Sequence, residues 1–212
     1  VEDLKMAIRT LGQKFAQIYG QGESPMTITS LTKDQHSDKN DPKLEEHLSS
    51  AGTPQIGIEV RVVDENDQAL GPNEIGEVIV RGETVMSGYF NNPEASAQTL
   101  RGGWLHTGDL GYVAGGNLFV TGRTKDVIIR GGRNLYPHEV EASVGALPDV
   151  RTGCVAAFGL LNETRGTEQF VIVAETRLTE QQSRADLQRR ITATVTEQIG
   201  VTPDRIVLAH PG

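Results

Sequence analysis

Residues 121–141 read TGRTKDVIIRGGRNLYPHEVE and mark the point at which the composition of the chain changes. Up to Gly122 the chain carries 9 basic and 17 acidic residues, and from Arg123 onward it carries 11 of each. Five of the six lysines precede Gly122, with Lys125 the exception, whereas ten of the fourteen arginines follow it. A shift of this kind favours two structural units joined near residues 122–126.

The segment that follows this stretch alternates between strand and helix patterns. Strands are expected at DVIIRGG, GCVAAFG, FVIVAET and RIVLA, and helices at PHEVEASVGAL and from Thr179 to about Ile199. Pro137 suits a first helical turn, and Thr179 is the expected N-cap of the second helix. That helix carries an apolar residue at every fourth position, which predicts a buried stripe of Leu187, Ile191, Val195 and Ile199. The segment therefore predicts a small α+β unit over residues 123–212.

The segment that precedes the stretch has mostly strand patterns. The segment LKMAIRTLGQKFAQIYG starts with a short helical pattern and ends on the apolar run FAQIYG, which suits a buried strand. A polar loop, TKDQHSDKNDPKLEEH, follows. Beyond it, clusters of Gly, Asn and Asp separate the β-branched runs EVRVV, GEVIVRG and GNLFVTG. Such spacing is typical of hairpins, so residues 1–122 are expected to be β-rich and the whole chain to be α+β.

The composition excludes several classes of protein. The 212 residues carry a formal net charge of −8 and a pI near 5.2, which argues against a nucleic-acid-binding surface. No run approaches the length of a transmembrane segment, and the start, VEDLKMAIRT, resembles no signal peptide. The single cysteine, Cys154, cannot form an internal disulfide, which favours the reducing cytoplasm. Because the chain begins without Met and ends just after an apparent strand, we expect it to be a fragment.

Three clusters place glycine beside charged or hydroxyl side chains: YGQGES at 19–24, GGWLHTGDLGY at 102–112 and the stretch 121–141. Backbone N–H groups and charges in such segments can approach an oxygen-rich anionic ligand closely. None matches the nucleotide motifs GxxxxGK[ST] or GxGxxG, and no His/Cys set has metal-ligand spacing. Taken singly, each is equally explained as a strand end, a turn, an exposed charged loop or a tight hairpin.

Taken together, in this order and spacing, the clusters resemble the adenylate-forming acyl-activating enzymes. The segments PQIGIEVRVVDENDQALGPNEIGEVIVRG and SGYFNNPEASAQTL are similar to the segments that connect these motifs in the family. Its members convert a carboxylate and ATP to an acyl adenylate and pyrophosphate, and most then transfer the acyl group to a thiol. The resemblance implies the C-terminal, β-rich part of the large ATP- and acyl-binding domain over 1–122 and the small mobile domain over 123–212.

The resemblance assigns roles to residues of the first cluster. Tyr19 would lie against the adenine, and Gly20 and Gly22 would be further nucleotide-binding residues. Glu23 would hold Mg²⁺, for which a carboxylate is a suitable hard ligand. Gly22 stands where the family usually has a threonine that donates to the α-phosphate. That contact is therefore lost here or is supplied by a backbone N–H.

It also assigns roles in the other two clusters. Asp109 would accept hydrogen bonds from both ribose hydroxyls, and Arg123 would reach the ribose or a phosphate. Lys125 corresponds to the hinge of the small domain, and Gly132 to the wall of the tunnel for the pantetheine thiol. We expect His106 to be a surface or hydrogen-bonded residue rather than an acid or base. In such enzymes the phosphate-binding loop lies upstream of the position of Val1 and the adenylation lysine just after that of Gly212, so the chain alone is expected to be inactive.

The branch of the family is suggested by GGRNLYPHEVE, which looks like an acyl- or aryl-CoA synthetase. The implied substrates are ATP with Mg²⁺, CoA and a carboxylic acid, with a fatty acid the first choice. A fatty acyl-AMP ligase that delivers to an acyl carrier protein is the alternative, because LFVTGRTKDVII, GRNLYP and GVTPDRIVLAHPG resemble that branch, although the connection after YGQGES is short for it. A second alternative is a non-catalytic binding module, which Gly22 favours.

Overall fold

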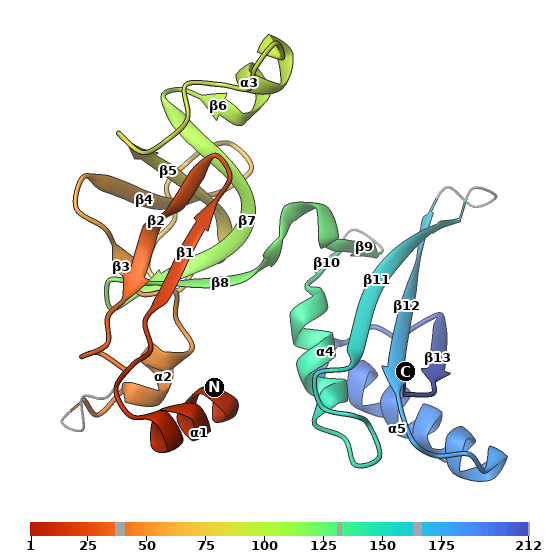
Figure 1. Cartoon of the computed structure of the whole chain (residues 1–212). Coiled ribbons are helices and arrows are strands. Elements are labelled where there is room, and N and C mark those ends of the chain that lie inside the picture. Colours follow the sequence, from red (N-terminus) through yellow and green to blue (C-terminus); the bar gives the residue numbers. More distant parts are fainter. Residues whose placement is uncertain (37–40, 131–132, 163–166, 212) are drawn as a thin grey trace. The chain divides into compact units, whose positions relative to one another are not determined.

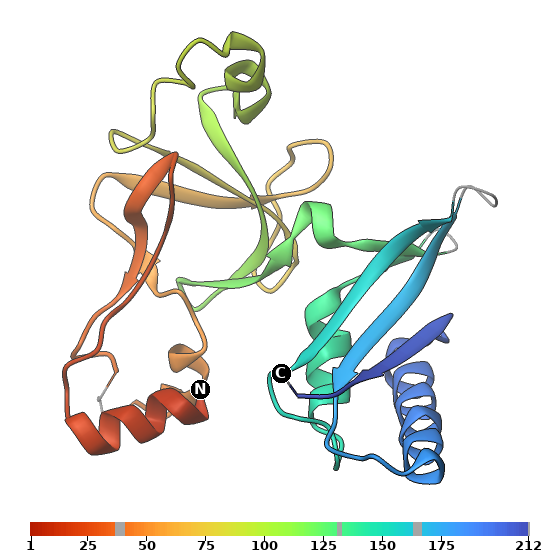
Figure 2. The same cartoon turned by 45° about the vertical axis from the view of Figure 1, so that its right-hand side comes forward.

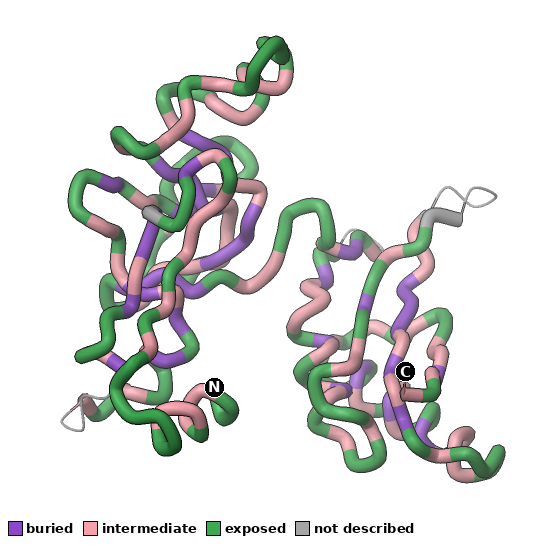
Figure 3. Tube along the Cα trace, viewed as in Figure 1, coloured by how far each residue is buried: buried purple, intermediate pink, exposed green. Residues whose placement is uncertain are grey.

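The computed structural model describes residues 1–36, 41–130, 133–162 and 167–211. The chain divides into two compact units, Val1–Thr121 and Gly122–Gly212, and each unit has a hydrophobic core of its own (Figures 1 and 3). The α+β class predicted from the sequence is confirmed. The assignment of residues 1–122 and 123–212 to a large and a small domain stays a prediction.

The first unit is built mainly from two antiparallel sheets. Its helices are α1 (Glu2–Leu11), α2 (Leu44–Leu48) and α3 (Pro93–Thr99). Its strands are β1 (Gln17–Gln21), β2 (Ser24–Leu31), β3 (Thr53–Pro54), β4 (Ile58–Val63), β5 (Gly76–Gly82), β6 (Leu100–Arg101), β7 (Trp104–Ala114) and β8 (Asn117–Arg123), the last of which runs into the second unit. One sheet has the order β1-β2-β3, and the other has the order β4-β5-β7-β6 with β8 also paired to β7.

The core of the first unit follows from β-branched and leucine side chains on these strands. Val78 and Val80 of β5 and Leu105 of β7 are fully buried, and Ile28 of β2 packs into the same cluster. Valine and isoleucine suit strands because their branched side chains pack well on a pleated surface. The core therefore ties β1 and β2 to the larger sheet, and this places the first two glycine-rich clusters of the sequence in one unit.

The second unit is a three-stranded sheet covered by helices. It contains the 3₁₀ turn η1 (Thr124–Asp126), the strands β9 (Ile128–Arg130), β10 (Arg133–Leu135), β11 (Val155–Asn162), β12 (Thr167–Glu175) and β13 (Arg205–Ala209), and the helices α4 (Pro137–Gly145) and α5 (Gln181–Ile199). Strands β11 and β12 are antiparallel, β12 and β13 are parallel, and β9 pairs with β10. Both helices lie on the same face of this sheet (Figure 2).

The helix predictions are confirmed except at one end. Leu187, Ile191 and Val195 are fully buried, with Ile199 partly buried against the same core, and Pro137 occupies the first turn of α4. The expected N-cap Thr179 is wrong, because α5 begins at Gln181 after Glu180. The Arg184 guanidinium donates to the carbonyl oxygen of Leu178, in the segment before α5, and to that of Leu208 in β13.

Cys154 lies immediately before β11 and is half-buried, so it is not part of the strand as the sequence suggested. Over the described ranges, no helix combines the length and the apolar character that crossing a membrane requires.

Candidate functional site

The hairpin of β1 and β2 carries the first glycine-rich cluster. Gln21 pairs with Ser24, so Gly22 and Glu23 form the turn. The pairing is irregular near Gly20, where an added Cβ would lie 2.3 Å from the backbone nitrogen of Met26 and 2.8 Å from the carbonyl oxygen of Ser24. No side chain fits against backbone at such distances, so glycine is required for β2 to approach β1 this closely.

A β-bulge in β7 carries the second cluster. The pairing of β5 with β7 is regular on either side, but Val78 alone faces the three residues 107–109. Gly108 has φ +69°, in the left-handed region that glycine adopts without strain. The Thr107 hydroxyl donates to the carbonyl oxygen of Val78 at 2.6 Å and accepts from the Asp109 N–H at 3.1 Å. Bulges re-aim side chains, and this one directs the Asp109 side chain toward β1.

Side chains of the two clusters meet at Asp109, which is only 5% exposed. The Tyr19 hydroxyl donates to Oδ2 of Asp109 at 2.6 Å, and Nε2 of Gln21 donates to the same oxygen at 2.8 Å. Nε2 of Gln21 also lies 2.9 Å from the carbonyl oxygen of Thr107. The structure thus brings together Tyr19 and Asp109, two of the residues singled out from the sequence.

Gln21 belongs to the same site, although the sequence analysis missed it. Alternate residues of a strand share a face, so the position two residues after Tyr19 was the available signal. Tyr19 also lines an open pocket of about 360 Å³ together with Ile18, Ser50 and Val120. The aromatic residue therefore borders a space on one side and holds the buried carboxylate through its hydroxyl.

Glu23 is held at the tip of the hairpin by a segment that follows β5. Its Oε1 accepts a hydrogen bond from the Tyr89 hydroxyl at 2.5 Å, and its carbonyl oxygen accepts from the Met86 N–H at 2.8 Å. The hydrogen bond to the Glu23 carboxylate raises the pKa of Tyr89 above its ordinary value, and desolvation acts in the same direction. Tyr89 lies in SGYFNNPEASAQTL, and its contact with Glu23 was not predictable from spacing.

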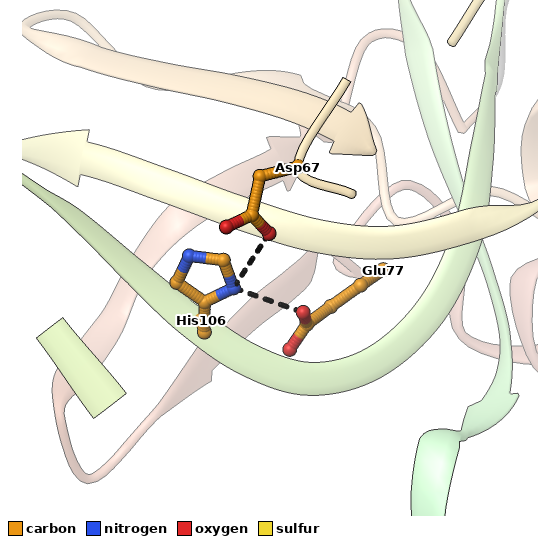
Figure 4. A group of neighbouring side chains, drawn as sticks. All are labelled: Asp67, Glu77 and His106. Carbon is orange, nitrogen blue, oxygen red and sulfur yellow. Dashed lines mark hydrogen bonds and ion pairs between the residues drawn. The ribbon is translucent and has the colours of Figure 1, made fainter. Parts of the chain in front are cut away.

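A second polar group lies next to the bulge, formed by Asp67, Glu77, Arg101 and His106. Figure 4 shows both carboxylates beside one ring nitrogen of His106, and Nδ1 of this residue lies 2.9 Å from Oε2 of Glu77 and 4.0 Å from Oδ1 of Asp67. His106 is 9% exposed, which matches the hydrogen-bonded role and not the surface role considered for it.

Asp67, Glu77 and His106 place potential metal-ligand atoms within 4.8 Å of one another. A cation is already among them, because Nη2 of Arg101 lies 2.6 Å from Nδ1 of His106. The same nitrogen lies 3.4 Å from Asp67 and 3.6 Å from Glu77. We therefore describe the group as an ion-pair network and not as a metal site.

The remaining predicted residues, Arg123, Lys125 and Gly132, belong to the second unit. Arg123 ends β8 and Lys125 lies in η1, and both are exposed. Gly132 lies outside the described residues. Arg130, which lies two residues before Gly132, donates to the carbonyl oxygen of Glu168 at 2.8 Å and to Oδ1 of Asp204 at 2.5 Å. The roles given to Arg123, Lys125 and Gly132 stay predictions.

The known sequences to which this chain is similar belong to one family. Residues 2–90 match the family model described as AMP-binding enzyme. The chain is 40% identical over 153 residues to a medium/long-chain-fatty-acid–CoA ligase of Mycobacterium tuberculosis, covering 72% of this chain and 26% of that protein. It is 39% identical over 168 residues to a 2-succinylbenzoate–CoA ligase of Geobacillus kaustophilus, covering 79% and 32%. The chain thus spans about a quarter to a third of the length of these relatives.

Solved structures agree with the sequences. An amide bond synthetase from Marinactinospora thermotolerans superposes with a TM-score of 0.77 at 30% identity, covering 98% of this chain and 40% of the other. O-succinylbenzoate coenzyme A synthetase from Bacillus subtilis, in complex with AMP, gives 0.73 at 28% identity, with 97% and 39% covered. McyG A-PCP complexed with phenylalanyl-adenylate gives 0.66 at 31% identity, with 92% and 34% covered. The chain belongs to the AMP-binding family of adenylate-forming enzymes.

Proposed function

We propose that the protein containing this chain is an ATP-dependent acid–thiol ligase of the acyl-CoA synthetase kind. In the first step a carboxylate oxygen of the acid attacks the α-phosphorus of ATP, pyrophosphate leaves, and an acyl adenylate forms. In the second step the thiol of CoA attacks the acyl carbon and AMP leaves. The names of the relatives support this class, and the structure supports it through one observation, the joining of Tyr19 and Gln21 to the buried carboxylate of Asp109.

The proposed roles follow from what each side chain offers a nucleotide. Adenine would lie in the pocket bordered by Tyr19, whose ring offers an aromatic face. The ribose would lie beside Asp109, since a carboxylate has two acceptor oxygens for two neighbouring hydroxyls. Tyr19 and Asp109 are in direct contact, so base and sugar of one nucleoside can reach both. Arg123 would contact the ribose or a phosphate in the bound arrangement.

The family implies Mg²⁺, and the described residues fit it through Glu23. Mg²⁺ is commonly bound through one or two carboxylates together with phosphate oxygens, and the Glu23 carboxylate is fixed in place by Tyr89. When bound, the ion would neutralise charge on the phosphates during adenylation. The further proposals are that Lys125 is the hinge of the small domain and that Gly132 borders the path of the thiol.

The identity of the carboxylic acid and that of the acyl acceptor are also part of the proposal. The Mycobacterium tuberculosis relative acts on medium- and long-chain fatty acids, which makes these the first acids to test, with aromatic acids beside them because the Geobacillus relative acts on 2-succinylbenzoate. A carrier protein is the alternative acceptor, supported by the likeness to the McyG structure. We propose a cytoplasmic location, because Cys154 is the one cysteine of these 212 residues and has no partner for a disulfide within them.

The test uses the full-length protein with ATP, Mg²⁺ and a panel of medium-chain, long-chain and aromatic acids, with and without CoA. Mass spectrometry should find acyl-CoA only when CoA is present. Acyl-AMP that accumulates in both conditions would indicate an acyl-AMP ligase, and no adenylate from any acid would indicate a non-catalytic module. The 212-residue chain alone is expected to form no adenylate, because it spans only about a quarter to a third of the length of the ligases to which it is similar.

Asp109→Ala in the full-length protein should lower kcat/KM for ATP by roughly a hundredfold or more, because two hydrogen bonds to a charged group are removed. Asp186→Ala is the matched control, since this half-exposed carboxylate of α5 pairs locally with Arg189. In the 212-residue chain, fluorescence of its single tryptophan, Trp104, reports whether the first unit of each variant is folded. A folded Asp109→Ala protein with unchanged kinetics would contradict the assignment.

A further inference from the structure

The bulge at residues 107–109 interrupts the ladder between β5 and β7, because Val78 alone faces three residues. Two side chains accept the hydrogen bonds of N–H groups that have no partner strand at the bulge. The Thr107 hydroxyl accepts from the Asp109 N–H at 3.1 Å, and Oε1 of Glu77 accepts from the Gly108 N–H at 3.1 Å. A partly buried N–H that finds no strand partner is costly unless a side chain accepts from it. Glu77 therefore holds the residue immediately before Asp109.

The other oxygen of Glu77 is fixed as well. Oε2 lies 2.9 Å from Nδ1 of His106 (Figure 4). The Arg101 guanidinium lies 3.6 Å from the same oxygen. A proton on Nδ1 of His106 would be donated to Glu77, whereas a proton on the other ring nitrogen would leave Nδ1 to accept from Arg101. In the first state Oε2 accepts a hydrogen bond from His106, and in the second it keeps the ion pair with Arg101 at 3.6 Å, so a positively polarised group lies beside it in both.

This carboxylate is hydrogen-bonded to the residue immediately before Asp109. Gly108 has φ +69°, and a Cβ added to it would meet nothing within 4 Å, so no close approach of another segment explains this glycine. The Gly108 N–H donates to Glu77, and the Thr107 hydroxyl bridges Val78 and Asp109 on either side of it, so Glu77 holds the centre of the bulge. The restrained bulge in turn presents Asp109 to Tyr19 and Gln21.

We propose that Glu77 is a positioning residue for the nucleotide: it holds the bulge at residues 107–109 so that Asp109 faces the ribose. This inference rests on the proposed function for its ligand, and on the hydrogen bonds of Glu77 alone for its structural part. Glu77 does not touch the ligand and acts through Gly108 and Asp109. The roles of Asp67 and Arg101, the more exposed members of the network, are limited to orienting Glu77 and His106.

The structural part is tested on the 212-residue chain by amide hydrogen exchange measured with NMR. Glu77→Ala and Glu77→Asp should speed exchange of the Gly108 N–H roughly tenfold, because the first lacks an acceptor and the second is one methylene too short. Glu77→Gln should retain slow exchange, since its amide oxygen can accept and its NH₂ can donate to His106. Glu59→Ala is the matched control, because that carboxylate pairs with Arg81 on the same sheet.

The functional part is tested on the full-length protein. Glu77→Ala should raise KM for ATP roughly tenfold with little change in KM for the acid, and Glu77→Gln should restore most of the loss. If Glu77→Ala does not fold, the comparison of Glu77→Asp with Glu77→Gln decides. Equal Gly108 exchange in the wild type and Glu77→Asp would overturn the inference, as would an unchanged KM for ATP. Absence of adenylate from the wild type would overturn the proposed function instead, and the exchange rates would still decide whether Glu77 holds the bulge.

Discussion

At the scale of single residues, Gly20 shows why the first cluster contains glycine. An added Cβ would meet the backbone of Met26 and Ser24 at 2.3–2.8 Å, and backbone cannot move aside as a flexible side chain can. The adjacent residues, Tyr19 and Gln21, are the two that reach Asp109. A displacement of the hairpin at Gly20 would therefore also disturb these contacts.

Gly20→Ala should destabilise the first unit by about 1–3 kcal/mol through this overlap. Gly22→Ala is the control in the same hairpin, since its added Cβ meets nothing within 4 Å, and it should change stability by no more than about 0.5 kcal/mol. Urea unfolding followed by Trp104 fluorescence measures both, because the single tryptophan lies in the first unit. Equal effects of the two substitutions would show that close backbone approach does not explain Gly20.

At the scale of elements, Asp204 connects three strands of the second unit. It lies just before β13, and its Oδ2 accepts from the N–H of Phe170 in β12 at 2.8 Å. Its Oδ1 accepts from Arg130 at the end of β9. The Asp204 carboxylate thus connects the parallel strands β12 and β13 to the end of β9. Strand β9 lies just before Gly132, the residue predicted to border the path of the thiol.

Asp204→Ala should cost the second unit about 1–3 kcal/mol, because it leaves the N–H of the fully buried Phe170 without this acceptor. Asp186→Ala, which removes local contacts with Gln182 and Arg189 on α5, should stay within about 0.5 kcal/mol. Urea unfolding followed by far-UV circular dichroism, which α5 dominates in this unit, provides the measurement. If Asp204→Ala lowers the free energy of unfolding no more than Asp186→Ala does, the hydrogen bonds of Asp204 do not stabilise the second unit.

At the scale of the whole molecule, the chain has two separate cores. Leu105 belongs to the core of the first unit and Leu187 to that of the second, and both side chains are fully buried. Units with their own cores can unfold as separate cooperative transitions. The boundary at residues 121–122 coincides with the change in charge and in lysine and arginine content.

Leu105→Ala and Leu187→Ala should each destabilise one unit only, by about 2–5 kcal/mol. Leu105→Ala should shift the transition seen by Trp104 fluorescence, and Leu187→Ala should shift a transition seen by circular dichroism without moving the fluorescence midpoint. Denaturant curves of the two variants recorded with both probes give the answer. Coincident shifts of both probes in either variant would indicate a single cooperative unit.

Local patterns in the sequence were enough for most elements. The stripe of Leu187, Ile191 and Val195 follows from a helical repeat within one segment, and the β-branched runs of β4 and β5 follow from neighbouring residues. The start of α5 was misplaced because the chain there is held by hydrogen bonds of Arg184, one of which goes to the carbonyl oxygen of the distant Leu208. A pattern of neighbouring residues does not show such a contact. Periodicity is a property of consecutive residues, so it is readable without knowledge of the fold.

The candidate site could be predicted from the sequence only in part. The motifs around Tyr19, Glu23 and Asp109 stand in the sequence, and so does the likeness to adenylate-forming enzymes that they carry. Only the tertiary structure joined Tyr19 to Asp109, which are 90 positions apart, and added Gln21 and Glu77 to them. Such contacts depend on strand order and on where a bulge interrupts the pairing, and neither is encoded in the spacing of residues along the chain.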